Sequence, residues 1–99
     1  MIRIENSSVF SYNNILVKAF GNDYDFGDLN ANELSDYQTF DNAYRYAYTQ
    51  LDIENEQFII QPIDFVGETE LENGNYTYII SADTTAELYG RLNMILRED

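Results

Sequence analysis

The stretch of residues 19–44 limits what this chain can fold into more than any other part of the sequence. It contains six acidic and six aromatic residues, but no lysine and no arginine. A core element would not carry so many carboxylates, and a loop built only for solubility would not need so many rings. The mixture predicts a negatively charged surface with rings available for contact.

The whole chain of 99 residues shares this imbalance, because 18 acidic residues face five basic ones and the formal net charge is -13. Self-repulsion on this scale costs stability, so we expect a compensating role for the charge. Abundant Asn, Ile, Tyr and Phe are typical of AT-rich genomes, which also favour Lys, yet Lys18 is the only lysine. Halophilic adaptation and a plain acidic protein are the rival explanations. The length predicts a single domain, 1–99, with one core.

Several classes of function are disfavoured. The chain has no His and no Cys, so the commonest general base, the Ser or Cys hydrolase machinery and thiolate metal ligands are missing. Residues 23–28 resemble the opening of a calcium loop, but Gly27 stands at the third ligand position and Leu34 at the twelfth. We therefore expect no enzyme, no cofactor and no specific metal site, with loose cation binding by the acids left open. The lack of a long apolar run or signal core predicts a cytoplasmic protein that does not enter a membrane.

The first part of the chain predicts strands. Residues 2–5 alternate apolar and charged side chains, which is typical of a half-buried strand, and residues 6–8 are predicted to form a turn. Residues 9–12 and 15–20 are strand-like. Asn13 and Asn14 between them predict a two-residue hairpin, because Asn tolerates the left-handed conformation.

The middle of the chain predicts a loop, a helix and a strand. Residues 22–34 show no clean period, which indicates a loop or one irregular helical turn. Apolar residues at spacings of three and four predict a helix at about 39–52, with Thr39 as its N-cap. Residues 58–66 are rich in branched and aromatic side chains and predict a strand, in which Pro62 marks an edge, a bulge or a bend.

The last part predicts a hairpin and a second helix. Asn73 and Gly74 form a hairpin turn signal before a strand at 75–82. Residues 84–87 have the spacing of a capping box, and Leu88, Leu92, Ile95 and Leu96 would line one face of a helix that runs to residue 99. The order β-β-β-α-β-β-α predicts an α+β fold, a small antiparallel sheet of four to five strands with two helices packed on one face.

Acids without a nearby base, together with exposed tyrosines, are the candidate contact residues. Alternate residues of an extended segment lie on one face about 6.6 to 6.8 Å apart, which imitates a row of backbone phosphates. Exposed tyrosine is a favoured interface anchor. Solvated acids that keep hairpin ends from aggregating are the alternative interpretation. The candidate partner-binding residues are Asp23, Tyr24, Asp25, Asp28, Glu33, Asp36, Tyr37, Asp52, Glu54, Glu56, Glu68, Glu70 and Glu72.

A surface of this charge would repel DNA and RNA, but it could occupy the basic groove of a protein that binds them. In size, charge and composition the whole chain resembles phage-encoded inhibitors of bacterial defence, including anti-CRISPR proteins and DNA-mimic anti-restriction proteins. The resemblance implies a non-enzymatic inhibitor in the host bacterial cytoplasm, whose partner is a basic DNA- or RNA-binding protein such as a Cas effector. An immunity protein or antitoxin against a basic nuclease toxin, and a self-associating accessory domain, are the alternative hypotheses.

Overall fold

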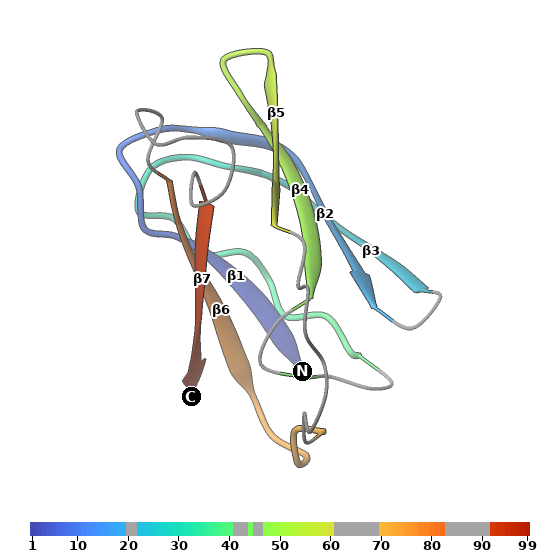
Figure 1. Ribbon diagram of the computed structural model, residues 1–99. Helices are drawn as coiled ribbons and strands as arrows, with labels where there is room; N and C mark the ends of the chain where they lie inside the picture. The colour runs from blue at the N-terminus through green and yellow to red at the C-terminus, as the bar shows by residue number, and fades with distance from the viewer. Residues whose placement is uncertain (20–21, 41–43, 45–46, 61–69, 83–91) are drawn as a thin grey trace.

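The computed structural model describes residues 1–19, 22–40, 44, 47–60, 70–82 and 92–99 (Figure 1). Within these ranges the chain forms seven strands and no helix. The strands are β1 (Ile2–Asn6), β2 (Tyr12–Ala19), β3 (Asn22–Leu29), β4 (Tyr48–Ile53), β5 (Glu56–Ile60), β6 (Tyr76–Ala82) and β7 (Leu92–Glu98).

The described strands belong to two sheets, which Figure 1 shows side by side. The three-stranded sheet has the order β1-β6-β7, in which β1 runs parallel to β6 and β7 runs antiparallel to it. The four-stranded sheet has the order β3-β2-β4-β5 and is antiparallel throughout. The inward side chains of both sheets join in one hydrophobic core.

Two predicted strands of the three-stranded sheet are confirmed. In β1, Ile2 and Ile4 are buried and alternate with the half-buried Arg3 and Glu5. The strand predicted at 75–82 is β6, which begins at Tyr76. In both strands, alternation between the core and the outer face follows from the two-residue period of extended backbone.

The predicted helix at 39–52 is wrong where the structure describes it, because its last five residues belong to strand β4. Thr49, Leu51 and Ile53 are buried and alternate with half-buried residues, which is the period of a strand. Leu51 fits both a helical spacing and a spacing of two, so it could not decide between them. The β-branched Thr49 and Ile53 favour the strand.

The second predicted helix is also wrong for its described part, because Leu92–Glu98 is strand β7. Leu92 and Met94 are buried, whereas Ile95, which the helix would have buried, is 56% exposed. The predicted helix start at 84–87 and Leu88 lie outside the described residues. The α+β class is therefore replaced by an all-β arrangement over the described residues.

The hairpin predicted at Asn13 and Asn14 is wrong, because β2 passes through both residues without turning. Asn14 does adopt a left-handed conformation, with φ of 54°. It uses this conformation in a bulge, where the register of β2 shifts against both of its neighbours. Gly27 of β3, with φ of 69°, pairs with Ile15 at the same irregularity. Residues 22–29, predicted as irregular, form β3.

The predicted strand at 58–66 is confirmed for residues 58–60 of β5, and Pro62 lies outside the described residues. A hairpin turn does form, between β4 and β5, where Glu54 and Asn55 have φ of 51° and 67°. Positive φ at both turn residues matches the right-handed twist of the paired strands. The hairpin predicted at Asn73 and Gly74 is wrong, because within the described sheets β6 pairs with β1 and β7 instead of β5.

Residues 32–38, here called the bridging segment, connect the edges of the two sheets. The backbone N–H of Ile2 donates to Gln38 O at 2.8 Å, and that of Ser35 donates to Ile4 O at 2.9 Å, so the segment runs along the edge strand β1. The side-chain amide of Gln38 donates to Asp25 O of β3 at 2.6 Å. The segment thereby shields the edge of β1 and holds β3 beside it.

Two buried polar side chains also stabilise this arrangement through hydrogen bonds to the backbone. The Tyr12 hydroxyl donates to Ile80 O at 2.9 Å and so joins β2 to β6, and burial raises the pKa of Tyr12. The Asn6 side chain is fully buried, donates to Phe10 O and accepts from Ser8 N–H. These contacts satisfy groups that would be costly to bury alone. Asn6 still belongs to β1 and the chain bends at 8–10, so the turn predicted at 6–8 begins later than expected.

Candidate functional site

In strand β3, which lies in the stretch of residues 19–44, the acidic and the aromatic side chains point to different sides of the sheet. Asp23 and Asp25 are exposed, whereas Tyr24 and Phe26, between and after them, are partly buried and pack against the core. The Tyr24 ring stacks on Phe40 with a centroid distance of 3.8 Å, and Phe26 lies 6.3 Å from Phe40. Tyr24 was predicted as an exposed contact residue. The structure makes its ring an anchor that holds the acidic strand in place.

The outer side of the four-stranded sheet gathers four of the candidate acids. In register, Asp23 lies opposite Lys18, and Asp25 lies opposite Leu16. Because directly opposite residues project to the same side of a sheet, these side chains form one surface with the outward residues of β4 and β5. We call it the acidic face, and it consists of Leu16, Lys18, Asp23, Asp25, Asp28, Tyr48, Gln50, Asp52, Gln57 and Ile59.

Asn14, on the inner strand β2, hydrogen-bonds to two carboxylates of the acidic face. Its backbone N–H donates to Asp28 Oδ1 at 2.9 Å, and its side-chain amide donates to Asp52 Oδ2 at 3.0 Å. Two neutral donors of Asn14, its backbone N–H and its side-chain amide, therefore orient carboxylates from the strands on both sides of β2 without cancelling their charge. Sequence reasoning missed this role of Asn14, although the tolerance of Asn for positive φ was a usable signal.

Lys18 is the one basic residue that the described part of the chain places on the acidic face. Its ammonium lies 5.8 Å from the centroid of the Tyr48 ring and its strand position is opposite Asp23. One lysine against four carboxylates leaves this face strongly negative.

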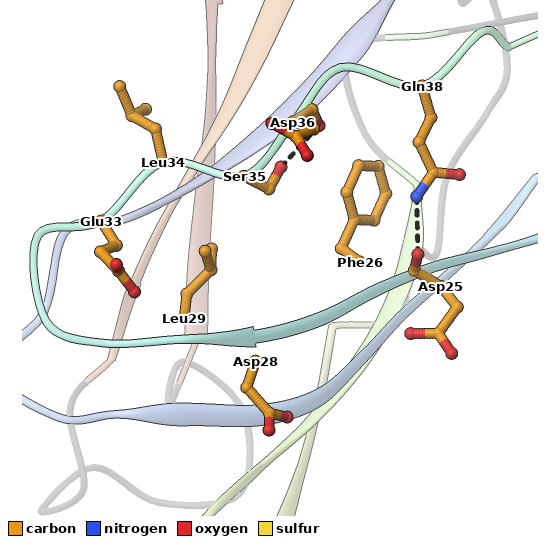
Figure 2. A pocket seen from close by; sticks show the side chains of 9 residues that line it. All are labelled: Asp25, Phe26, Asp28, Leu29, Glu33, Leu34, Ser35, Asp36 and Gln38. Atoms are coloured by element: carbon orange, nitrogen blue, oxygen red, sulfur yellow. Dashed lines mark hydrogen bonds between the residues drawn. The ribbon is translucent and has the colours of Figure 1, made fainter.

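An open hollow of about 370 Å³ lies between β3 and the bridging segment, and Asp25, Asp28, Glu33 and Asp36 contribute to its lining (Figure 2). Glu33 Oε1 accepts the backbone N–H of Asn30 at 2.7 Å, which closes the turn after β3. Among the described residues, no group of three or more acids is arranged to hold a metal ion. The described acids around the hollow are therefore not gathered as metal ligands.

Figure 2 also shows how the side chains of β3 divide. Phe26 and Leu29 point from the strand toward the bridging segment, while the carboxylates of Asp25 and Asp28 point to the other side. Asp25 Oδ1 additionally accepts the backbone N–H of Gly27 at 2.8 Å, so its carboxylate is held at the bulge. Asp25 and Asp28 thus belong to the acidic face, whereas Glu33 and Asp36 belong to the bridging segment on the other side of β3.

The remaining candidate acids do not extend the acidic face in one row. Asp52 belongs to it, but Glu54 sits in the β4–β5 turn and Glu56 follows that turn, so an even spacing along an extended strand is wrong for these three. Glu70 and Glu72 are exposed before β6, at the opposite end of the molecule from this turn (Figure 1). Glu68 lies outside the described residues.

Tyr37 belongs to a different surface from the one predicted. Its hydroxyl donates to Asp99 Oδ2 at 2.6 Å, and the guanidinium of Arg3 lies 4.7 Å from its ring centroid. The hydrogen bond to Asp99 raises the pKa of Tyr37. This residue therefore packs against the outer side of the three-stranded sheet.

On the outer side of the three-stranded sheet, the positively and negatively charged side chains form ion pairs. Arg97 bonds Glu5 Oε1 at 3.1 Å and Asp99 Oδ1 at 3.0 Å, while Thr77, fully buried beneath them, donates to Asp99 Oδ2 at 2.6 Å. The hydrogen bond from Thr77, followed by that from Tyr37, lowers the pKa of Asp99 from its ordinary 3.8 to about 2. We call this surface the compensated face, and it consists of Arg3, Glu5, Tyr37, Thr77, Ile79, Ile95, Arg97 and Asp99.

Comparison with protein-family models, with curated proteins and with solved structures finds no match to this chain. In the described part of the chain, no helix has the length and apolar character needed to cross a membrane.

Proposed function

We propose that this protein is a non-enzymatic inhibitor of the anti-CRISPR type, which binds the basic nucleic-acid-handling surface of a bacterial defence nuclease. The observation that carries the proposal is the acidic face. Asp23, Asp25, Asp28 and Asp52 share one sheet surface, on which the described residues include a single base, Lys18.

The spacing of these carboxylates suits a surface that normally binds nucleic acid. Asp23 and Asp25 are two positions apart on β3, a separation of about 6.6 to 6.8 Å in an extended strand. Asp52 lies on β4, two strands away, and neighbouring strands are about 4.8 Å apart. Carboxylates at such intervals can pair with Lys and Arg side chains that otherwise contact phosphates.

The acidic face is also held in advance of binding. Asn14 orients Asp28 and Asp52, the Gly27 N–H holds Asp25, and the stacked Tyr24 fixes β3 from the inner side. Side chains that are already ordered lose less entropy when a partner binds. The net charge of -13 would speed the encounter with a basic partner and make binding weaker as salt increases.

Exposed apolar side chains on the same face favour a protein partner. Ile59 is 45% exposed, and in the cross-strand rows Gln50 lies opposite both Leu16 and Ile59. The aliphatic stems of lysine and arginine pack along apolar surface while their charged heads reach carboxylates. Leu16 beside Asp25, and Ile59 at the far end of the same cross-strand row, provide the apolar part of such a contact.

The test is a target-DNA cleavage assay with a panel of purified Cas effector complexes, with and without the protein, at low and high salt. We expect inhibition of at least one effector, and loss of inhibition as salt rises. The double variant Asp25→Asn/Asp52→Asn keeps the hydrogen-bond acceptors but removes two charges. We expect it to inhibit about tenfold less well, equivalent to about 1.4 kcal/mol of binding free energy.

The matched control is Glu72→Gln/Glu98→Gln, which removes the same charge away from the acidic face and should inhibit like the wild type. Equal weakening by both double variants would show that net charge alone acts, which would refute a defined acidic face. Neutralisation of basic nuclease toxins in a parallel assay, with every Cas effector unaffected, would replace the proposal by the immunity-protein function.

A further inference from the structure

The compensated face has an exposed apolar centre. Ile95 on β7 is 56% exposed, and its register partner on β6 is Ile79. Ile79 in turn lies opposite Glu5 of β1. Ile95 lies halfway along β7 and not at a loop tip, so the sheet backbone holds this pair of isoleucines in a fixed position.

The charges around this centre cancel. Two arginines, Arg3 and Arg97, face two carboxylates, Glu5 and Asp99, so these four side chains sum to zero in a chain whose total is -13. Their heads are already fixed by contacts of 3.0 to 3.6 Å. A polar rim that is ordered beforehand costs little further entropy when it surrounds an apolar contact and excludes water from it.

We propose that the compensated face is the interface of a homodimer, with Ile79 and Ile95 of each copy at its centre. Two chains that each carry -13 repel, so they can associate only where carboxylates are already paired. Of the two outer sheet faces, the compensated face meets this condition and the acidic face does not. It carries positively and negatively charged groups, as a two-fold symmetric contact of one patch with itself requires.

This dimer and the proposed inhibitor function predict opposite effects of salt. Screening removes the long-range repulsion between two acidic chains, so dimerisation should become tighter as salt increases. Binding of a basic partner to the acidic face should become weaker under the same change. The two interfaces use different residues, so a dimer would leave both acidic faces free, and either proposal can fail without the other.

The test is sedimentation equilibrium of the full chain over a concentration series up to about 1 mM, at low and at high salt. We expect a monomer–dimer equilibrium whose dissociation constant falls at high salt. Ile95→Lys should raise the dissociation constant at least about tenfold, because a central apolar contact becomes charged. The matched control Ile59→Lys, an exposed isoleucine on the acidic face, should leave it unchanged.

Three outcomes overturn the proposal: a monomer at every concentration and salt, a dimer that Ile59→Lys disrupts, or a dimer that Ile95→Lys leaves intact. If circular dichroism shows that Ile95→Lys does not fold, Ile95→Thr replaces it, since threonine keeps the β-branch. NMR spectra of the wild type on dilution provide the second measurement. Signals of Ile79 and Ile95 should shift, and those of Leu16 and Ile59 should stay in place.

Discussion

The outer faces of the two sheets differ in whether their carboxylates are neutralised by basic side chains. On the compensated face, Arg3 and Arg97 neutralise Glu5 and Asp99 above the buried Thr77. On the acidic face, strand β2 places Asn14 and Lys18 beside four carboxylates. The backbone N–H and the side-chain amide of Asn14 each orient one of them without neutralising it. Both are outward faces of sheets over one shared core, so the difference lies in which residues the strand order brings together.

The comparison shows that a chain with so few bases does not spread them evenly. Arg3 and Arg97 come from opposite ends of the sequence, and the order β1-β6-β7 places them on both sides of Thr77. Two of the three bases in the described residues thus neutralise one face, and the repulsive charge remains on the other. This division separates a surface whose charges are paired from one whose negative charges are mostly unpaired.

The largest effect is expected from removing the centre of the compensated face. Thr77→Val keeps the shape of the side chain but leaves Asp99 and the two arginines without a buried partner. We expect a loss of about 1 to 3 kcal/mol in the free energy of unfolding, measured by urea denaturation. Thr49→Val is the matched control, because the buried Thr49 donates one neutral hydrogen bond to Ala47 O. Equal losses in both variants would mean that the charged network contributes nothing.

A smaller effect is expected on the acidic face from Asn14→Ala. The substitution removes the amide that reaches Asp52 and places alanine at φ of 54°, so the free energy of unfolding should fall by about 1 to 2 kcal/mol. Asn14→Gly relieves the backbone strain and should lose less. If glycine were as destabilising as alanine, the hydrogen bond to Asp52, and not the backbone conformation, would be the main contribution of Asn14.

The acid limb of the stability curve tests the compensated face through Asp99. Because the folded-state pKa of Asp99 is lowered from 3.8 to about 2, its contribution to stability is complete above pH 4 and is lost as the pH falls toward 2. Asp99→Asn should lower stability at neutral pH and flatten the profile between these values. Urea denaturation at a series of pH values measures both effects, and an unchanged slope in the variant would contradict the assignment.

The smallest effect, and one of opposite sign, is expected from Asp25→Asn/Asp52→Asn. Removing two unneutralised charges should raise the free energy of unfolding by about 0.5 kcal/mol at low salt, and high salt should abolish the gain. Thermal unfolding at two salt concentrations measures it. A clear loss of stability would show that the hydrogen bonds from Gly27 and Asn14 to these carboxylates outweigh the charge repulsion, which would contradict the prediction.

Part of the fold follows from local pattern. The alternation in β1 and β6 appears in the structure as predicted. The helix predictions that cover residues 48–53 and 92–98 were wrong because a few apolar residues there satisfy the spacing of a helix and of a strand at once. Burial of Thr49 and exposure of Ile95 resolve the two cases, and both depend on the neighbouring strands.

The candidate site was predictable as a list of acids but not as a surface. Tyr24 and Tyr37 were expected to face a partner, yet Phe40 and Asp99, distant in sequence, hold them. Asp52 joins Asp28 only because Asn14 of the middle strand reaches both. Glu54 leaves the expected row because the β4–β5 turn bends the chain there.

The sequence by itself therefore determined the net charge, the local alternation of inward and outward residues, and the residues that tolerate positive φ. The tertiary structure decided which carboxylates are neutralised and which remain free. The physical reason is that strand pairing joins segments such as β1 and β6, whose contact no local pattern encodes. The stretch 19–44 accordingly contributes β3 to the acidic face and the bridging segment to the edge of β1, so its acids and rings have separate roles.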